Sequence, residues 1–187
     1  MWRDAELIEL VDGAVSEAMA KGGDAIACRP GCSHCCVGPF AVTERDLVRL
    51  RTGAETLPTE ERERLAQRCA ESREAMREGF PGEWATGMIE SQQAADIFDS
   101  QHPWLPCPIL DLETNRCALH AWRPVACRLH GPALRIDGFV LQHCRLNYSG
   151  LTADEIDRLR VGFATPETEA SPLTYIAWAV PGNSNGR

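Results

Sequence analysis

Four cysteines fall within residues 28–36, and their side chains are the clearest candidates for chemistry in this chain. A thiol is soft and easily oxidised, so four thiols in one short segment are seldom there for packing alone. Pro30 and Gly31 lie between the first two cysteines and predict a tight loop whose sulfur atoms converge. Such a loop is typical of a disulfide framework, or of thiolates that bind a metal ion or an iron–sulfur cluster.

The cellular compartment decides between these two chemistries. The chain starts without the apolar run of a secretory signal, and no apolar run approaches the length of a membrane span. We therefore expect a cytoplasmic protein with no membrane contact, in a reducing environment where disulfides are rare. The nine cysteines are also an odd number, which disfavours a closed set of disulfides. The sequence thus favours metal or cluster binding.

Length and composition bound the class of protein. The 187 residues fit one domain and suffice to bury a core. A hydrophobic fraction of 44% and a charged fraction of 25% are typical of soluble globular proteins. The net charge of −8 leaves no electrostatic footprint for nucleic acid. A protein partner or a protein substrate stays open.

A second group of cysteines follows later in the chain: Cys107, Cys117, Cys127 and Cys144. The turn sequence at 113–116 predicts a short hairpin with Cys107 and Cys117 on its two arms. Residues 118–128 are predicted to be helical, with Pro124 near a first turn or at a kink. The two cysteine groups would then be presented by loops, a hairpin and a helix.

The elements that must position these groups are mostly helices. Apolar spacing and capping residues predict helices over 4–21, 43–51, 58–78, 84–99, 153–161 and 171–180. Asp137-Gly138 predicts a type I′ hairpin, and residues 40–42 a short extended piece. Cys69 shares an apolar helix stripe with Leu65 and Met76, which indicates a core residue and not a ligand.

These elements predict a mainly α fold with short β-hairpins, built as a small irregular cysteine-rich metal-binding domain. We expect a single domain over 1–187, with a helical insertion at about 52–103 and a disordered tail from about 181.

The spacing Cys28-x3-Cys32-x2-Cys35 equals the cluster motif of radical S-adenosylmethionine enzymes. Those enzymes place the motif after the first strand of a partial β/α barrel. Here a predicted helix precedes it, Cys36 is adjacent, and too little chain remains for alternating βα units. The sequence therefore disfavours this kind of radical chemistry.

The full cysteine pattern resembles that of the YkgJ-type cysteine-cluster family of zinc- or iron-chelating domain proteins. The resemblance rests on Cys28-x3-Cys32-x2-Cys35-Cys36, Cys107-Pro108-x-Leu110 and Cys117-x-Leu119-His120-x2-Arg123-Pro124-x2-Cys127-Arg128, with Cys144 as a late member. One departure is His120, where tyrosine is usual. The resemblance implies metal or iron–sulfur binding with no settled biochemical role. Flagellin lysine methylases have a similar cysteine-rich region, but this chain has no glycine-rich methyltransferase fingerprint, so that activity is not carried over.

All cysteines except Cys69 are predicted metal ligands: Cys28, Cys32, Cys35, Cys36, Cys107, Cys117, Cys127 and Cys144. Adjacent cysteines point in different directions, so it stays open which of Cys35 and Cys36 ligates, and whether there are one or two sites. Four thiolates around zinc or an oxidised 4Fe–4S cluster leave a net charge of about −2, which needs compensation when buried. Arg123 and Arg128 flank Cys127 and are predicted to compensate it; ordinary surface ion pairs are the alternative.

Four histidines lie near cysteines and could also ligate: His34, His120, His130 and His143. None is predicted singly, because such a histidine more often lies beside a site than in it. No Ser/His/Asp set, phosphate-binding loop or paired-carboxylate motif is found in the sequence.

Two functions from different classes follow. The first is a protein that binds iron, as a 4Fe–4S cluster, with a redox or protein-modification role; whether it is an enzyme stays open. The alternative is a structural zinc-binding module that presents a surface to a partner without catalysis. A thiol-based metal carrier is a third, weaker hypothesis.

Overall fold

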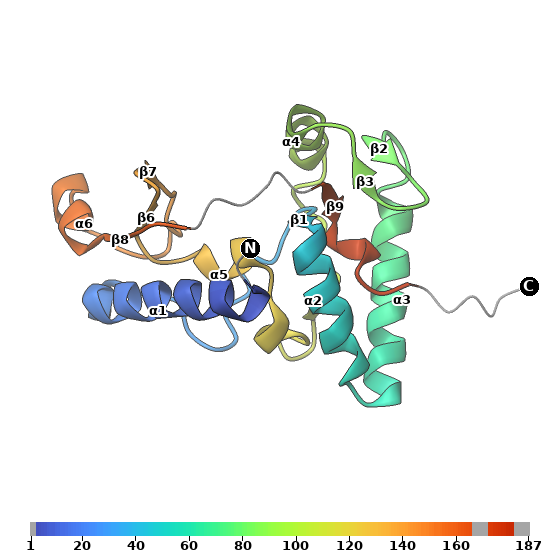
Figure 1. Ribbon diagram of the computed structural model, residues 1–187, viewed down its shortest axis with the longest axis horizontal. Helices are drawn as coiled ribbons and strands as arrows, with labels where there is room; N and C mark the ends of the chain where they lie inside the picture. The colour runs from blue at the N-terminus through green and yellow to red at the C-terminus, as the bar shows by residue number, and fades with distance from the viewer. Residues whose placement is uncertain (1–2, 166–171, 182–187) are drawn as a thin grey trace, which may run out of the picture. The chain divides into compact units, whose positions relative to one another are not determined.

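The computed structural model describes residues 3–165 and 172–181. These residues are mainly helical with short strands, as predicted (Figure 1). The chain divides into two compact units, described separately below. The first unit comprises Met1–Pro30 and Val125–Ala170, and the second comprises Gly31–Pro124 and Ser171–Arg187. No helix in the described part of the chain is long and apolar enough to cross a membrane.

The first unit begins with helix α1, Asp4–Gly22, which confirms the helix predicted over 4–21. Its inward stripe is Leu7, Val11, Ala14 and Ala18, which recur at the helical period and are buried. The chain then turns at Gly23, whose φ of 47° lies in the left-handed region that glycine adopts readily.

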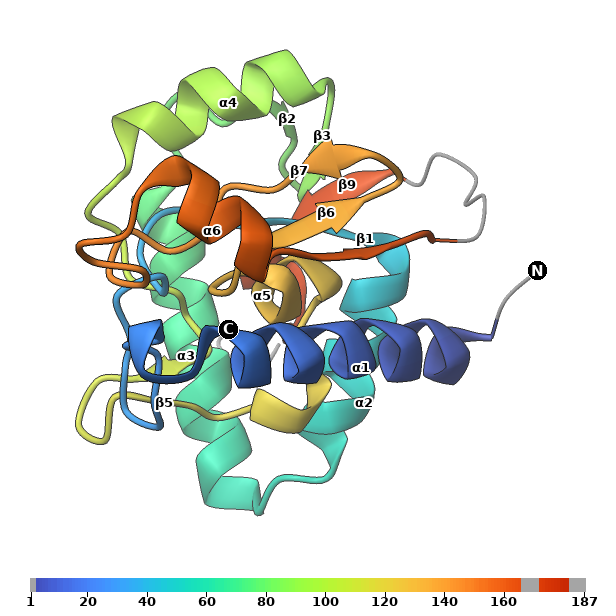
Figure 2. The same cartoon turned by 90° about the vertical axis from the view of Figure 1, so that its left-hand side faces the viewer.

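A small sheet completes this unit, with strand order β7-β6-β8 (Figure 2). Strands β6, Leu134–Ile136, and β7, Phe139–Val140, form the hairpin that Asp137-Gly138 predicted, and both turn residues have positive φ as a type I′ turn requires. Strand β8, Val161–Phe163, runs parallel to β6. Ala14, Ala18, Leu134 and Val161 form the core between helix and sheet.

Two short helices of the first unit differ in length from their predictions. Helix α6, Ala153–Leu159, has the predicted cap, because the Thr152 hydroxyl accepts from the Glu155 N–H, but it ends before Val161, which belongs to β8. Helix α5 covers only Val125–Leu129. The predicted helix over 118–128 is wrong for its first half, because Arg123 is extended (φ −54°, ψ 143°) immediately before Pro124.

The second unit is built on a four-stranded antiparallel sheet with strand order β1-β9-β3-β2. Its strands are β1, Ala41–Thr43; β9, Leu173–Tyr175; β3, Met88–Ile89; and β2, Gly82–Glu83. The helix predicted over 171–180 is wrong where the structure describes it: β9 pairs with β1 and β3, and the 3₁₀ helix η3, Ile176–Trp178, follows. Ser171 lies outside the described residues, as does the tail after Pro181.

Helices α2, Glu44–Glu55, and α3, Thr59–Ala75, share one hydrophobic core in this unit. Thr43 and Asp46 form the predicted capping box at the start of α2. Cys69 is fully buried in the core, as predicted. The core also contains Ile109 and Leu119, which flank the later cysteines of the unit.

The segment predicted as a helix over 84–99 forms the β2–β3 hairpin followed by helix α4, Gln92–Gln101. The prediction is wrong for the residues before α4, because Gly87 turns the chain with a φ of 73° and its N–H donates to the Glu83 carbonyl at 2.8 Å. The rings of Trp84, Phe98 and Tyr175 then contact Phe80 edge-on, so the hairpin is held by aromatic packing.

Candidate metal centre

The backbone joins the two cysteine segments of the second unit. The Cys36 N–H donates to the Ser33 carbonyl at 2.8 Å, which closes the turn that carries Cys35. The Cys107 N–H then donates to the Cys36 carbonyl at 3.0 Å, and Val37 forms an isolated antiparallel bridge with Pro106. Backbone hydrogen bonds alone therefore hold the segments around Cys36 and Cys107 side by side, with no metal ion needed.

The hairpin predicted around residues 113–116 is present and positions Cys117. Strand β4, Leu110–Asp111, pairs antiparallel with β5, Arg116–Cys117, and Cys117 lies opposite Leu110. Cys107 does not lie on an arm of this hairpin. Cys107 precedes β4 in a turn, which is closed by a hydrogen bond from the Leu110 N–H to the Cys107 carbonyl at 3.0 Å. The prediction of a cysteine on each arm is therefore correct for Cys117 and wrong for Cys107.

Three thiols of the second unit interact electrostatically. The Cys35 thiol shares a hydrogen bond with Cys36, and this bond, burial and the charge of Cys36 together hold the pKa of Cys35 far above its ordinary value. Burial raises the pKa of Cys117, and the charge of Cys35 adds to that rise. The pKa values of both thiols are pulled down by the nearby guanidinium of Arg123. Arg123 is thus the cation that favours thiolates at this place.

Helix α2 fixes the backbone of Arg123. The Arg49 side chain is 5% exposed and pairs with Asp46, also 5% exposed, at 2.6 Å. The same Nη1 of Arg49 donates to the Arg123 carbonyl at 3.3 Å, while the Arg123 Nε donates to the His120 carbonyl at 3.2 Å. A buried ion pair on the helix therefore supports the segment that presents the guanidinium.

The same helix touches the residue before Arg123. Trp122 ends the 3₁₀ helix η2, His120–Trp122, and its ring lies against Gly53 of α2. A Cβ at Gly53 would come 2.3 Å from the Trp122 Cγ, so only glycine permits this approach. The sequence predicted Asp46 as a capping residue of α2 but not its ion pair with Arg49, nor the role of Gly53. The only available signal was a charged i,i+3 pair, which is ordinary on helix surfaces.

The predicted site residues divide between the two units. The second unit holds Arg123 and five predicted ligands: Cys32, Cys35, Cys36, Cys107 and Cys117. The first unit holds Arg128 and three: Cys28, Cys127 and Cys144. The chain passes from one unit to the other at Pro30–Gly31 and at Pro124–Val125, inside each cysteine motif.

Within the first unit, the predicted residues have local partners. The Arg128 side chain is 6% exposed and pairs with Asp12 of α1 at 2.6 Å. Cys144 is buried, and its N–H donates to the Gly131 carbonyl at 3.0 Å. The ring of His143 stacks edge-on against Tyr148, with centroids 5.1 Å apart. Charge compensation by Arg128 stays a prediction.

Among residues 3–165 and 172–181, no group of three or more His, Cys, Asp or Glu side chains has the arrangement that would hold a metal ion. The donor chemistry nevertheless fits a thiophilic metal. The thiols of Cys35, Cys36 and Cys117 lie in one electrostatic neighbourhood with Arg123. The thiols of the second unit are the donors that zinc and iron–sulfur clusters prefer.

A protein-family model described as "putative zinc- or iron-chelating domain", with the cysteine pattern CxxCxxCC, matches residues 27–145. The chain belongs to this family. The match covers most of the chain and includes both cysteine groups, which confirms the resemblance drawn from the cysteine spacing. The matched segment runs from the first cysteine loop to just past Cys144, which follows the Asp137-Gly138 hairpin. No curated protein and no solved structure gave a match.

Proposed function

We propose that this cysteine-cluster protein binds iron as a 4Fe–4S cluster through thiolates of its second unit. Cys35 and Cys117 are the central ligands in this proposal, with Cys32, Cys36 and Cys107 as candidates for the remaining positions. The observation that carries it is the shared neighbourhood of Cys35, Cys36 and Cys117 beside Arg123. Cys28, Cys127 and Cys144 of the first unit stay predicted ligands.

Charge supports this choice of ligands. A 4Fe–4S cluster with four thiolates carries a net charge of about −2 when oxidised, and a half-buried site needs a cation or N–H dipoles to compensate it. The pKa values of Cys35 and Cys117 are raised by hydrogen bonding, burial and neighbouring thiols, and the charge of Arg123 opposes that rise at both. The cation is therefore available where thiolates would form.

Under this proposal, the biochemical role is redox, or cluster-dependent modification of a protein in the cytoplasm. A cluster supplies one-electron chemistry when bound. The residues of the chain would hold it, tune its potential through Arg123 and limit access of water by packing against the core.

Structural zinc is the second candidate, because the family description covers both metals and the thiol donors suit both. Under that alternative, zinc would hold the loops of Cys36 and Cys107 in place as a surface for a partner. No electron transfer would be involved.

Metal analysis of anaerobically purified protein separates the two candidates. We expect about four iron and four sulfide per chain, with broad absorbance near 400 nm that bleaches on reduction with dithionite. Colourless protein with about one zinc per chain, unchanged after attempted cluster reconstitution, would overturn the iron–sulfur proposal in favour of structural zinc.

A further inference from the structure

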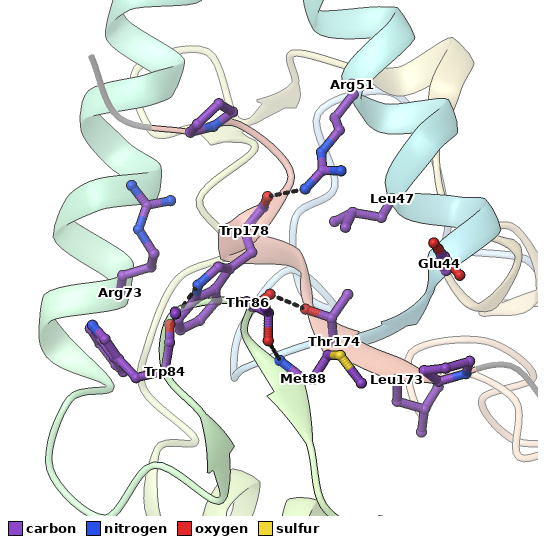
Figure 3. A pocket seen from close by; sticks show the side chains of 13 residues that line it. Glu44, Leu47, Arg51, Arg73, Trp84, Thr86, Met88, Leu173, Thr174 and Trp178 are labelled. Atoms are coloured by element: carbon purple, nitrogen blue, oxygen red, sulfur yellow. Dashed lines mark hydrogen bonds between the residues drawn. The ribbon is translucent and has the colours of Figure 1, made fainter. Parts of the chain in front are cut away.

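The second unit contains a cavity of about 630 Å³ that none of its cysteines lines (Figure 3). Helix α2, helix α3, the β2–β3 hairpin and strand β9 with η3 all contribute residues to its walls. Cavities that bind small molecules in proteins have volumes of about 300–1,000 Å³. The size of this one is therefore that of a ligand site.

Two indole rings form the firm apolar wall of the cavity. The Trp178 Nε1–H donates to the Trp84 carbonyl at 3.1 Å, and the two rings meet edge-on with centroids 5.2 Å apart. Leu47 and Met88 contribute further apolar surface (Figure 3). The ring positions are thus fixed before any ligand arrives, which lowers the entropic cost of binding.

Two arginines, Arg51 and Arg73, line the cavity and donate hydrogen bonds to different carbonyl groups. Arg73 donates from Nη1 to the carbonyls of Ala177 and Val180, so it supports the backbone that follows β9. Arg51 is exposed and donates from Nη2 to the Trp178 carbonyl at 3.3 Å, which orients its guanidinium at the cavity edge (Figure 3). A guanidinium has five N–H donors, and Arg51 uses one of them in that hydrogen bond.

The charges of the cavity are arranged along α2. Glu44 and Arg51 both line it and are two helical turns apart, about 10 Å at 1.5 Å per residue. The chain as a whole has a net charge of −8, yet two of the three charged residues in this lining are arginines. An anionic group would therefore be attracted to the Arg51 end and repelled from the Glu44 end.

We propose that this cavity binds a ligand in which a carboxylate is attached to a flat apolar group. The carboxylate pairs with Arg51, whose planar fork matches two carboxylate oxygens. The apolar group lies between Leu47 and Met88, against the small part of the Trp178 indole, 8% exposed, that lines the cavity. Free aryl carboxylates and the C-terminal residue of a peptide both have this chemistry. The proposal does not depend on the metal bound by the cysteines.

Titration of the full-length, metal-loaded protein tests this assignment. The probes are 3-phenylpropionate, the tripeptide acid acetyl-Ala-Ala-Phe, and the same tripeptide as its C-terminal amide. The readout is the indole ¹H–¹⁵N resonances. We expect saturable shifts for Trp84 and Trp178 with at least one acid, unchanged signals for the exposed Trp104, and binding of the amide at least about tenfold weaker than its acid.

The two acids distinguish the sources of the chemistry. Tighter binding of the tripeptide acid identifies a peptide terminus as the ligand class, and tighter binding of 3-phenylpropionate identifies a free aryl carboxylate. No saturable shift of Trp84 or Trp178 with either acid up to about 10 mM, or equal affinity for acid and amide, would overturn the proposal.

Variants at the edge of the cavity supply the second test. We expect Arg51→Met to weaken acid binding at least about tenfold, and Arg51→Lys to restore part of it, because the charge returns without the fork. The matched control is Arg64→Met on α3, an exposed arginine paired with Glu60, which should leave binding unchanged. Circular dichroism establishes that each variant is folded, and a folded Arg51→Met that binds acids like wild type contradicts the proposal. The acid–amide comparison on wild type decides the matter if that variant does not fold.

Discussion

The amide of Cys107 donates a hydrogen bond to the carbonyl of Cys36, so one cysteine segment holds the other through the backbone. This bond uses backbone atoms only and none of the thiols. A preset backbone means that metal binding has only to order side chains, which reduces the entropy lost on assembly.

The first prediction separates ligand thiols from the core thiol. We expect Cys117→Ala to lose most bound metal, because it removes a metal bond beside Cys35 and Arg123. Cys69→Ala should keep nearly full metal, because its side chain packs in the core and its loss costs about 1 kcal/mol. Metal-to-protein ratios on the two variants check this. Full metal in Cys117→Ala, or none in Cys69→Ala, would reverse the assignment.

The buried pair on α2 predicts a large loss of stability. We expect Arg49→Met to lower the free energy of unfolding by about 3 kcal/mol, because Asp46 is left without its buried counter-charge. The double variant Asp46→Asn/Arg49→Met should recover part of that loss. Urea denaturation measures both.

The control for this pair is Arg64→Met, which breaks an exposed pair with Glu60. We expect a change of less than about 1 kcal/mol there. If Arg49→Met lowers the free energy of unfolding by no more than Arg64→Met does, the Asp46–Arg49 pair does not support the Arg123 segment.

The contact between Gly53 and Trp122 predicts a steric defect near the site. We expect Gly53→Ala to cost about 2 kcal/mol and to lower metal content, because the new methyl group displaces the Trp122 ring and with it the neighbouring Arg123. Gly13→Ala on α1 is the matched change: its Cβ meets nothing within 4 Å, so we expect a gain of up to about 1 kcal/mol from helix propensity. Equal stability of the two variants would contradict this account.

Burial raises the pKa of Cys69 to about 11, which predicts a loss of stability at alkaline pH. Below the ordinary thiol pKa of 9.0 both the folded and unfolded chains keep the proton, so the contribution is fully present there. Between pH 9 and 11 the unfolded chain loses the proton first, and stability falls by up to about 3 kcal/mol. Cys69→Ala should remove that part of the pH dependence in reduced, metal-free protein. Parallel pH profiles of the melting temperature for wild type and variant would contradict the assignment to Cys69.

Local signals in the sequence predicted the elements that depend on local physics. The caps at Thr43 and Thr152 and the Asp137-Gly138 turn are formed by residues within a few positions of each other, so they could be read directly. Strand β9 could not, because Leu173–Tyr175 becomes a strand only by pairing with β1 and β3, while its apolar spacing alone also suits a helix.

The candidate site shows the same division. Cysteine spacing predicted the thiols, and proximity to Cys127 suggested Arg123. The support of Arg123 by Arg49 could not be predicted, because burial of the Asp46–Arg49 pair results from packing against residues distant in sequence. The prediction that Cys107 lies on a hairpin arm is wrong, because β4 begins at Leu110, the residue that pairs with Cys117. Cysteine spacing does not reveal that pairing.

The position of β9 near the end of the chain has a consequence for synthesis on the ribosome. The sheet of the second unit cannot form until Leu173–Tyr175 has been translated, because β9 is the strand that pairs with both β1 and β3. All nine cysteines, from Cys28 to Cys144, are translated before that strand. We expect the nascent chain to present these thiols on an unfinished scaffold, so the cell must deliver the metal late or shield the thiols until translation is complete.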